Sequence, residues 1–244
     1  MIGTCHYALF SYLTYTAPDF SNLKTLGYKL PKGWEVLAVS ASHTLDEIED
    51  NGYFGITFRK DKEVVFPHRG SVLKSETFID SCRLAFTYWT ISVLLFKKIE
   101  FTQFIAAKKF IDMVMKQLGD EGDIKYSFTG HSLGAPLGKI SAIYYNTKAR
   151  LFDNPGTKRI IDSEGYVKGQ KKFDIMSYQG ELNFINDCCD KYGEAIPVST
   201  KHYDFDGDST KLLIEILRDY FNTGTHALEY YRKIGCNLPE IFAA

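Results

Sequence analysis

Apolar and polar residues alternate over short stretches of the chain, the pattern that predicts β-strands. Glycine, asparagine or aspartate lies beside most of these stretches, as expected where strands end. The second and third stretches flank the charged tripeptide 60–62, which predicts a β-hairpin. The predicted strands cover residues 34–41, 53–60, 63–68, 124–129, 149–154, 173–179 and 194–200.

A different spacing marks the helices. In residues 101–119, apolar side chains recur at steps of three and four positions, and Gly119 supplies a stop. Further helices are expected directly after residue 136 and over residues 209–235. Antiparallel strands followed by strands that alternate with helices predict an α/β fold. The expected sheet is mixed and mostly parallel, is flanked by helices, and has an antiparallel hairpin at its N-terminal side. No repeat or linker divides the chain, so residues 1–244 are predicted to form a single domain.

Composition excludes some functions. Lys plus Arg (29) nearly equals Asp plus Glu (30), so there is no basic excess to attract nucleic acid. The five cysteines are odd in number and lack a C-x-x-C spacing. This pattern favours neither a disulfide framework nor a zinc site and predicts reduced thiols. The N-terminus lacks the charged and apolar regions of a signal peptide, which predicts the cytoplasm, although leaderless secretion would look the same.

Candidate chemistry lies in "YSFTGHSLGAPLGKISAIYY", residues 126–145. Chance alone gives G-x-S-x-G in roughly one chain in ten of this composition, so the motif by itself is weak. Here, however, a predicted strand precedes Ser132 and a predicted helix follows it, as a nucleophile elbow requires. Ser132 is therefore the predicted nucleophile, and the alternative is an ordinary strand-to-helix turn. The N–H of Leu133 is predicted to face a developing oxyanion.

Several segments together resemble one known family. They are "TGHSLGA" (129–135), "YFGITFRKDKEVVFPHRGS" (53–71), "YALFSYLTY" (7–15) and "RLFDNPGTK" (150–158). They are similar, in the same order, to motifs of the class 3 (fungal-type) lipases of the α/β-hydrolase superfamily. The resemblance implies an α/β-hydrolase fold and a serine hydrolase that cleaves carboxylic esters, first of all lipid esters, without a cofactor or metal. The apolar stretch 84–96 is predicted to be a buried core segment, and the resemblance offers the alternative of a lid that would touch a membrane surface transiently.

The resemblance also indicates the partners of the serine. His226 follows in the chain order Ser…acid…His and lies where the family places its base; His202 is the second choice among the histidines. Ser71, which closes "HRGS", is the expected second oxyanion donor. Two neighbouring residues are expected to be structural: His68, and Arg69 through an ion pair with a carboxylate.

The acid of the triad is expected after the strand at 173–179. The family's motif aligns best with Asn183, which could orient an imidazole as a neutral acceptor. We favour Asp187, because a carboxylate also stabilises the imidazolium. Glu181 and Asp190 are alternates. The uncertain acid leaves open a second class, an inactive hydrolase-like domain that binds a lipid or a partner. Transfer of the acyl group to an alcohol instead of water is also open.

Overall fold

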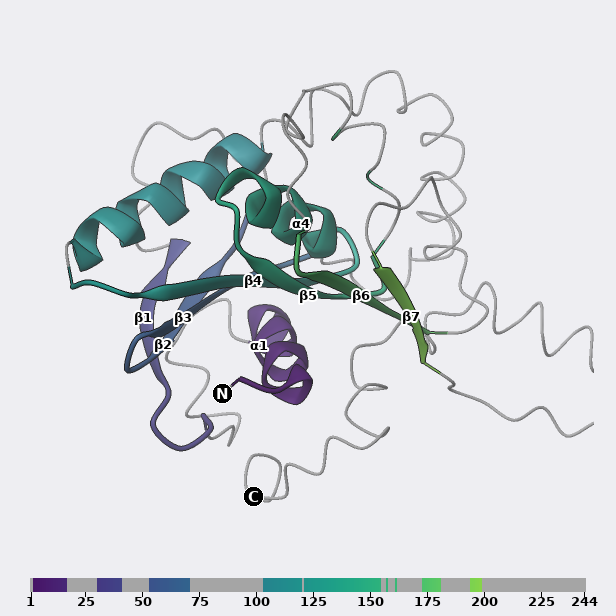
Figure 1. The fold of residues 1–244 in the computed structure, drawn as a ribbon, viewed down its shortest axis with the longest axis horizontal. Coiled ribbons are helices and arrows are strands. Elements are labelled where there is room, and N and C mark those ends of the chain that lie inside the picture. The colour runs from purple at the N-terminus through teal and green to yellow at the C-terminus, as the bar shows by residue number, and fades with distance from the viewer. Residues whose placement is uncertain are drawn as a thin grey trace, which may run out of the picture.

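The seven strands of the described residues form one mixed sheet in the order β1-β2-β3-β4-β5-β6-β7 (Figure 1). The computed structural model describes residues 2–16, 30–40, 53–70, 103–119, 121–154, 157, 161, 173–180 and 194–198. The labelled elements are α1 (Thr4–Thr16), β1 (Glu35–Val39), β2 (Ile56–Lys60), β3 (Glu63–His68), β4 (Lys125–His131), α4 (Gly134–Tyr144), β5 (Lys148–Phe152), β6 (Ile175–Gly180) and β7 (Glu194–Val198). Residues 103–118 are also helical.

The strand directions agree with the expected α/β fold. β1, β2 and β3 pair antiparallel, and β3 through β7 pair parallel. The predicted hairpin is confirmed, because Lys60 pairs with Glu63 across a two-residue turn. Asp61 in that turn has a φ of 52°, a conformation that aspartate tolerates well. The register of the parallel pair β3–β4 places His68 beside Gly130, so both strands end at the same edge of the sheet.

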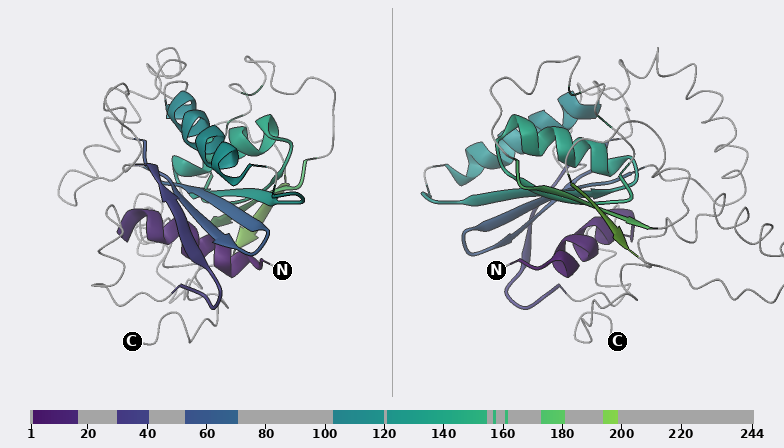
Figure 2. Two further views of the ribbon diagram at one scale, coloured as in Figure 1. Left: turned by 90° about the vertical axis from the view of Figure 1, so that its left-hand side faces the viewer. Right: turned by 45° about the vertical axis from the view of Figure 1, so that its right-hand side comes forward.

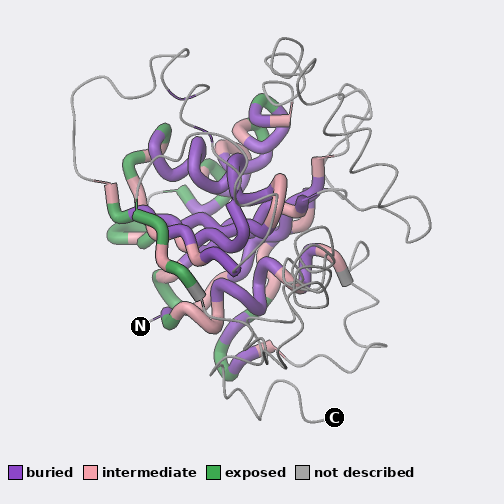
Figure 3. Tube along the Cα trace, turned by 90° about the vertical axis from the view of Figure 1, so that its right-hand side faces the viewer, coloured by how far each residue is buried: buried purple, intermediate pink, exposed green. Residues whose placement is uncertain are grey.

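Helices cover both faces of the sheet. α1 lies on one face, and the helix at 103–118 and α4 lie on the other (Figure 2). Side chains along the strands point alternately to the two faces of the sheet and so form two separate hydrophobic cores. Val64 and Phe66 pack with α4, whereas Val65 packs with α1. Buried residues concentrate in the sheet and on the helix faces towards it (Figure 3). Of the helices in the described residues, none is long and apolar enough to span a membrane.

The helix α1 was not predicted from periodicity. Its aromatic and β-branched residues have weak helix propensity, and the apolar residues of the helix lie on most of its faces. Packing decides its structure: Tyr7, Phe10, Ser11 and Thr14 are all buried at helical spacing. The hydroxyls of Ser11 and Thr129 lie 2.8 Å apart, which anchors α1 to β4.

The expectation of free thiols is wrong for Cys5, which is disulfide-bonded. An odd number of cysteines excludes only that all of them pair, and their spacing in sequence does not show which ones meet in space. The other four cysteines lie outside the described residues. Stable disulfides are typical of oxidising compartments. The compartment of this protein stays a prediction.

Candidate active site

Ser132 lies at the sharp turn between β4 and α4. Its φ of 54° is in the left-handed region, which costs a non-glycine residue about 1–2 kcal/mol. Two backbone hydrogen bonds hold it there. Its N–H donates to the carbonyl of Phe152 (3.1 Å), and its carbonyl accepts from the N–H of Ala135 (3.0 Å). The surrounding structure therefore keeps a half-buried serine in a strained turn, the geometry that exposes a nucleophilic hydroxyl.

Two glycines allow the turn to be this tight. A Cβ atom at Gly130 would overlap the carbonyl of Gly134, and a Cβ atom at Gly134 would overlap the carbonyl of His68. Both are the glycines of the G-x-S-x-G motif. Because these two residues lack a Cβ atom, α4 can begin directly against the ends of β3 and β4.

The N-terminus of α4 faces the same turn. Leu133 is the N-cap residue, with φ −65° and ψ −16°, and makes no side-chain capping hydrogen bond. A helix N-terminus carries a partial positive charge, and its first amides can donate to an anion. Leu133 directly follows Ser132 at this helix N-terminus, a position that is compatible with the oxyanion role predicted for its backbone N–H.

The end of β3 comes close to this donor. A Cβ atom at Gly70 would lie 2.7 Å from the carbonyl oxygen of His131 and 3.2 Å from the nitrogen of Leu133. The backbone at Gly70 thus lies against the elbow. Ser71, the expected second donor, is the next residue along the chain, and it lies outside the described residues.

His68 is buried and neutral, in agreement with the structural role expected for it. Burial lowers the pKa of its imidazole to about 3. The ring stacks on Phe128 with 6.0 Å between centroids, and its Nδ1 lies 3.0 Å from the hydroxyl of Tyr53. Arg69 differs from expectation. Among the described residues its guanidinium lies 4.5 Å from the ring centre of Phe54 and pairs with no carboxylate, because a half-buried position favours a cation–π contact.

Two residues that the sequence did not assign to the site, Asp153 and Tyr15, contact His131. Asp153 follows β5, is fully buried, and accepts a hydrogen bond from the N–H of Gly180 through Oδ1 (2.8 Å). Its Oδ2 lies 3.8 Å from Nε2 of His131. The hydroxyl of Tyr15 lies 3.1 Å from Nδ1 of the same ring. A carboxylate at the end of a strand was a signal available for Asp153; Tyr15 had no local signal.

The remaining predicted site residues lie outside the described residues and stay predictions. They are Ser71, Glu181, Asn183, Asp187, Asp190 and His226, together with the apolar stretch 84–96 for which a lid was the alternative. Within the described ranges, no group of three or more His, Cys, Asp or Glu side chains is arranged to hold a metal ion.

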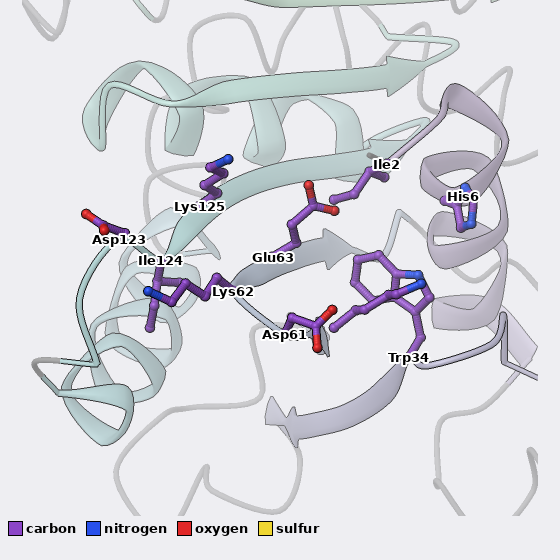
Figure 4. A pocket seen from close by; sticks show the side chains of 10 residues that line it. Ile2, His6, Trp34, Asp61, Lys62, Glu63, Asp123, Ile124 and Lys125 are labelled. Atoms are coloured by element: carbon purple, nitrogen blue, oxygen red, sulfur yellow. The ribbon is translucent and has the colours of Figure 1, made fainter.

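A hollow of about 870 Å³ lies at the other end of the strands from Ser132 (Figure 4). It borders the β2–β3 turn and the beginning of β4, whereas Ser132 follows the end of that strand. A strand of seven residues spans about 20 Å, so this hollow is not part of the elbow. Its lining residues are Ile2, His6, Trp34, Lys60, Asp61, Lys62, Glu63, Asp123, Ile124 and Lys125.

Comparison of the sequence with protein-family models and with curated protein sequences gives no match. The structure is similar to that of the triacylglyceride lipase of Rhizomucor miehei, with 12% identity and a TM-score of 0.45, over 75% of this chain and 71% of that one. It is also similar to lipase II of Rhizopus niveus, with 11% identity and a TM-score of 0.40, over 75% and 73% of the two chains. A mutant form of MDLA from Penicillium cyclopium gives 14% identity and a TM-score of 0.42, over 85% and 81%. This likeness concerns the fold alone.

Proposed function

We propose that this protein is a serine hydrolase of carboxylic esters with Ser132 as its nucleophile. The observation that carries the proposal is the φ of 54° at Ser132, on the turn between a parallel strand and a helix N-terminus. A structural turn has no need of serine there, since glycine would adopt the same backbone without strain. Of the five non-glycine residues with positive φ in the described part of the chain, the other four are Asp or Asn, which tolerate this conformation well. Strain retained at a serine is typical of functional sites.

The proposed reaction divides ester cleavage into two steps. Ser132 Oγ attacks the acyl carbon while His226 takes the hydroxyl proton, and the oxyanion accepts hydrogen bonds from the N–H groups of Leu133 and Ser71. Collapse of this intermediate transfers the proton to the leaving alcohol and leaves an acyl-enzyme, which water then hydrolyses with the same base. Asp187 is the proposed orienting acid, with Asn183 as the first alternate.

Lipid esters are the proposed substrate class, with transient contact to a membrane surface through the stretch 84–96. The chemistry in this proposal needs no cofactor. The resemblance of the sequence to class 3 lipases supports this substrate class, whereas chain length and head group are for a substrate panel to determine.

The test is covalent labelling with a fluorophosphonate probe, followed by intact mass. One adduct is expected on the wild-type protein and none on Ser132→Ala. Ser141→Ala is the matched control: Ser141 lies in α4, is buried, and its hydroxyl has no hydrogen-bond partner among the described residues. This variant should label like the wild type.

Detergent is included so that a closed lid cannot hide the serine. If folded wild-type protein takes no adduct under these conditions, Ser132 is a turn residue and the chain is an inactive hydrolase-like domain. If the adduct forms, product analysis with and without added alcohol separates hydrolysis from acyl transfer.

A further inference from the structure

The hydroxyl of Tyr15 connects two segments that both border the elbow. Tyr15 lies in the last turn of α1, on the face of the sheet opposite to α4. Its oxygen accepts a hydrogen bond from the N–H of Gly70 at 3.1 Å. The same oxygen lies 3.2 Å from the carbonyl oxygen of His131 and 3.1 Å from Nδ1 of its ring. The two rings meet edge to face, with 5.6 Å between their centres.

Counting donors and acceptors shows what this hydroxyl can do. Burial raises the pKa of Tyr15 above its ordinary value, so the group keeps its proton at any working pH. A phenolic hydroxyl has one hydrogen to donate and lone pairs to accept. The N–H of Gly70 uses one lone pair, and the hydrogen is directed to His131, at either its carbonyl or its ring. In both arrangements the hydroxyl links Gly70 to His131.

These two residues have a special place along the chain. Gly70 directly precedes Ser71, the proposed second oxyanion donor, and His131 directly precedes Ser132. The link therefore lies one residue from the proposed nucleophile and one residue from the proposed donor. Helix α1, which carries Tyr15, is itself anchored to β4 by the contact between Ser11 and Thr129.

We propose that Tyr15 is a positioning residue that sets the distance between the two sides of the oxyanion hole; this inference rests on the proposed function. Donors stabilise an oxyanion only when they lie about 2.7–3.1 Å from it. A misplacement of about 1 Å can lower a rate by about 100-fold. Gly70 has no side chain to hold its backbone, and among the described residues the hydroxyl of Tyr15 links its N–H to the elbow.

The test compares Tyr15→Phe with Tyr7→Phe. Both variants keep the ring and remove one hydroxyl from α1, but the hydroxyl of Tyr7 makes no hydrogen bond within the described residues. Turnover of a short-chain aryl ester is measured, and each kcat is divided by the number of sites that the fluorophosphonate probe titrates. Unfolded molecules, which the probe does not label, are then left out of the kcat per site.

For Tyr15→Phe we expect kcat to fall between about 10- and 100-fold with KM within about threefold of wild type, because the missing link affects the transition state. Tyr7→Phe should keep both values within about twofold. An unchanged kcat per titrated site in Tyr15→Phe, or a loss confined to KM, would overturn the positioning role while leaving the proposed function intact. A wild-type protein that neither labels nor turns over ester would instead overturn the proposed function, and this inference with it.

Discussion

The strained backbone at Ser132 can be measured through stability. Ser132→Ala and Ser132→Gly both remove the hydroxyl, so they differ only in the Cβ atom and the freedom of the backbone. At a φ of 54° a Cβ atom costs about 1–2 kcal/mol. Part of this is offset because glycine loses about 0.5–1 kcal/mol more conformational entropy on folding. We therefore expect Ser132→Gly to be more stable than Ser132→Ala by about 1 kcal/mol.

The same pair of substitutions at Ser141 supplies the control. Ser141 lies inside α4, where alanine is more stable than glycine by about 1 kcal/mol. The difference between glycine and alanine should thus have opposite signs at positions 132 and 141. Urea unfolding gives each free energy, and a difference of 1 kcal/mol shifts the melting temperature by about 2–4 °C in a chain of this size.

One result would refute this reasoning. If alanine is as favourable relative to glycine at position 132 as it is at position 141, residue 132 is not in a left-handed conformation in solution. The observation that carries the proposed function would then be lost. If glycine is more stable at 132 but the wild-type serine takes no probe, the strain exists without an activated nucleophile.

Three further predictions concern stability. Between pH 7 and pH 4.5 the free energy of unfolding should fall by about 2.5 kcal/mol through His68, because the unfolded chain takes up a proton near pH 6.5 whereas the pKa of the buried ring is about 3. Chemical denaturation at both pH values should show this loss to be absent in His68→Asn, and an unchanged pH dependence in that variant would contradict the assignment. Gly134→Ala should lose about 1–3 kcal/mol and probe labelling, since its Cβ would overlap the carbonyl oxygen of His68. A Cβ at Gly138 would lie 3.0 Å from the side chain of Leu151 and 3.2 Å from the carbonyl oxygen of Thr129, a milder contact, so Gly138→Ala should lose less; equal losses would count against the tight elbow. Reductant should lower the free energy of unfolding by about 2–4 kcal/mol in the wild type and have no such effect on Cys5→Ser; equal sensitivity of both proteins would show that Cys5 is unpaired.

Local patterns were sufficient for the parts of this protein that are built from neighbouring residues. Alternation predicted β2 and β3, and the charged tripeptide between them predicted the hairpin, because a two-residue turn is decided by the residues in it. Spacing of three and four predicted the helix at 103–118. The elbow was predicted in the same way: Gly130, Ser132 and Gly134 lie within five positions, and their strand and helix adjoin them directly.

The other contacts of the candidate site depend on residues that are distant in sequence. Tyr15 and His131 are 116 positions apart, and they meet because α1 packs on β4. Asp153 comes close to His131 because the parallel register of β4 and β5 brings both strand ends to one edge. Within the described part of the chain, Arg69 contacts the ring of Phe54 and pairs with no carboxylate.

The sequence by itself therefore determined most of the described elements and singled out Ser132 as the candidate nucleophile, since periodicity and turn chemistry act over a few residues. Only the tertiary structure decided which distant side chains lie beside the turn at Ser132. The physical reason is that a buried polar contact needs two groups at hydrogen-bonding distance. Sheet register and helix packing set that distance, whereas the spacing of the two residues along the chain does not.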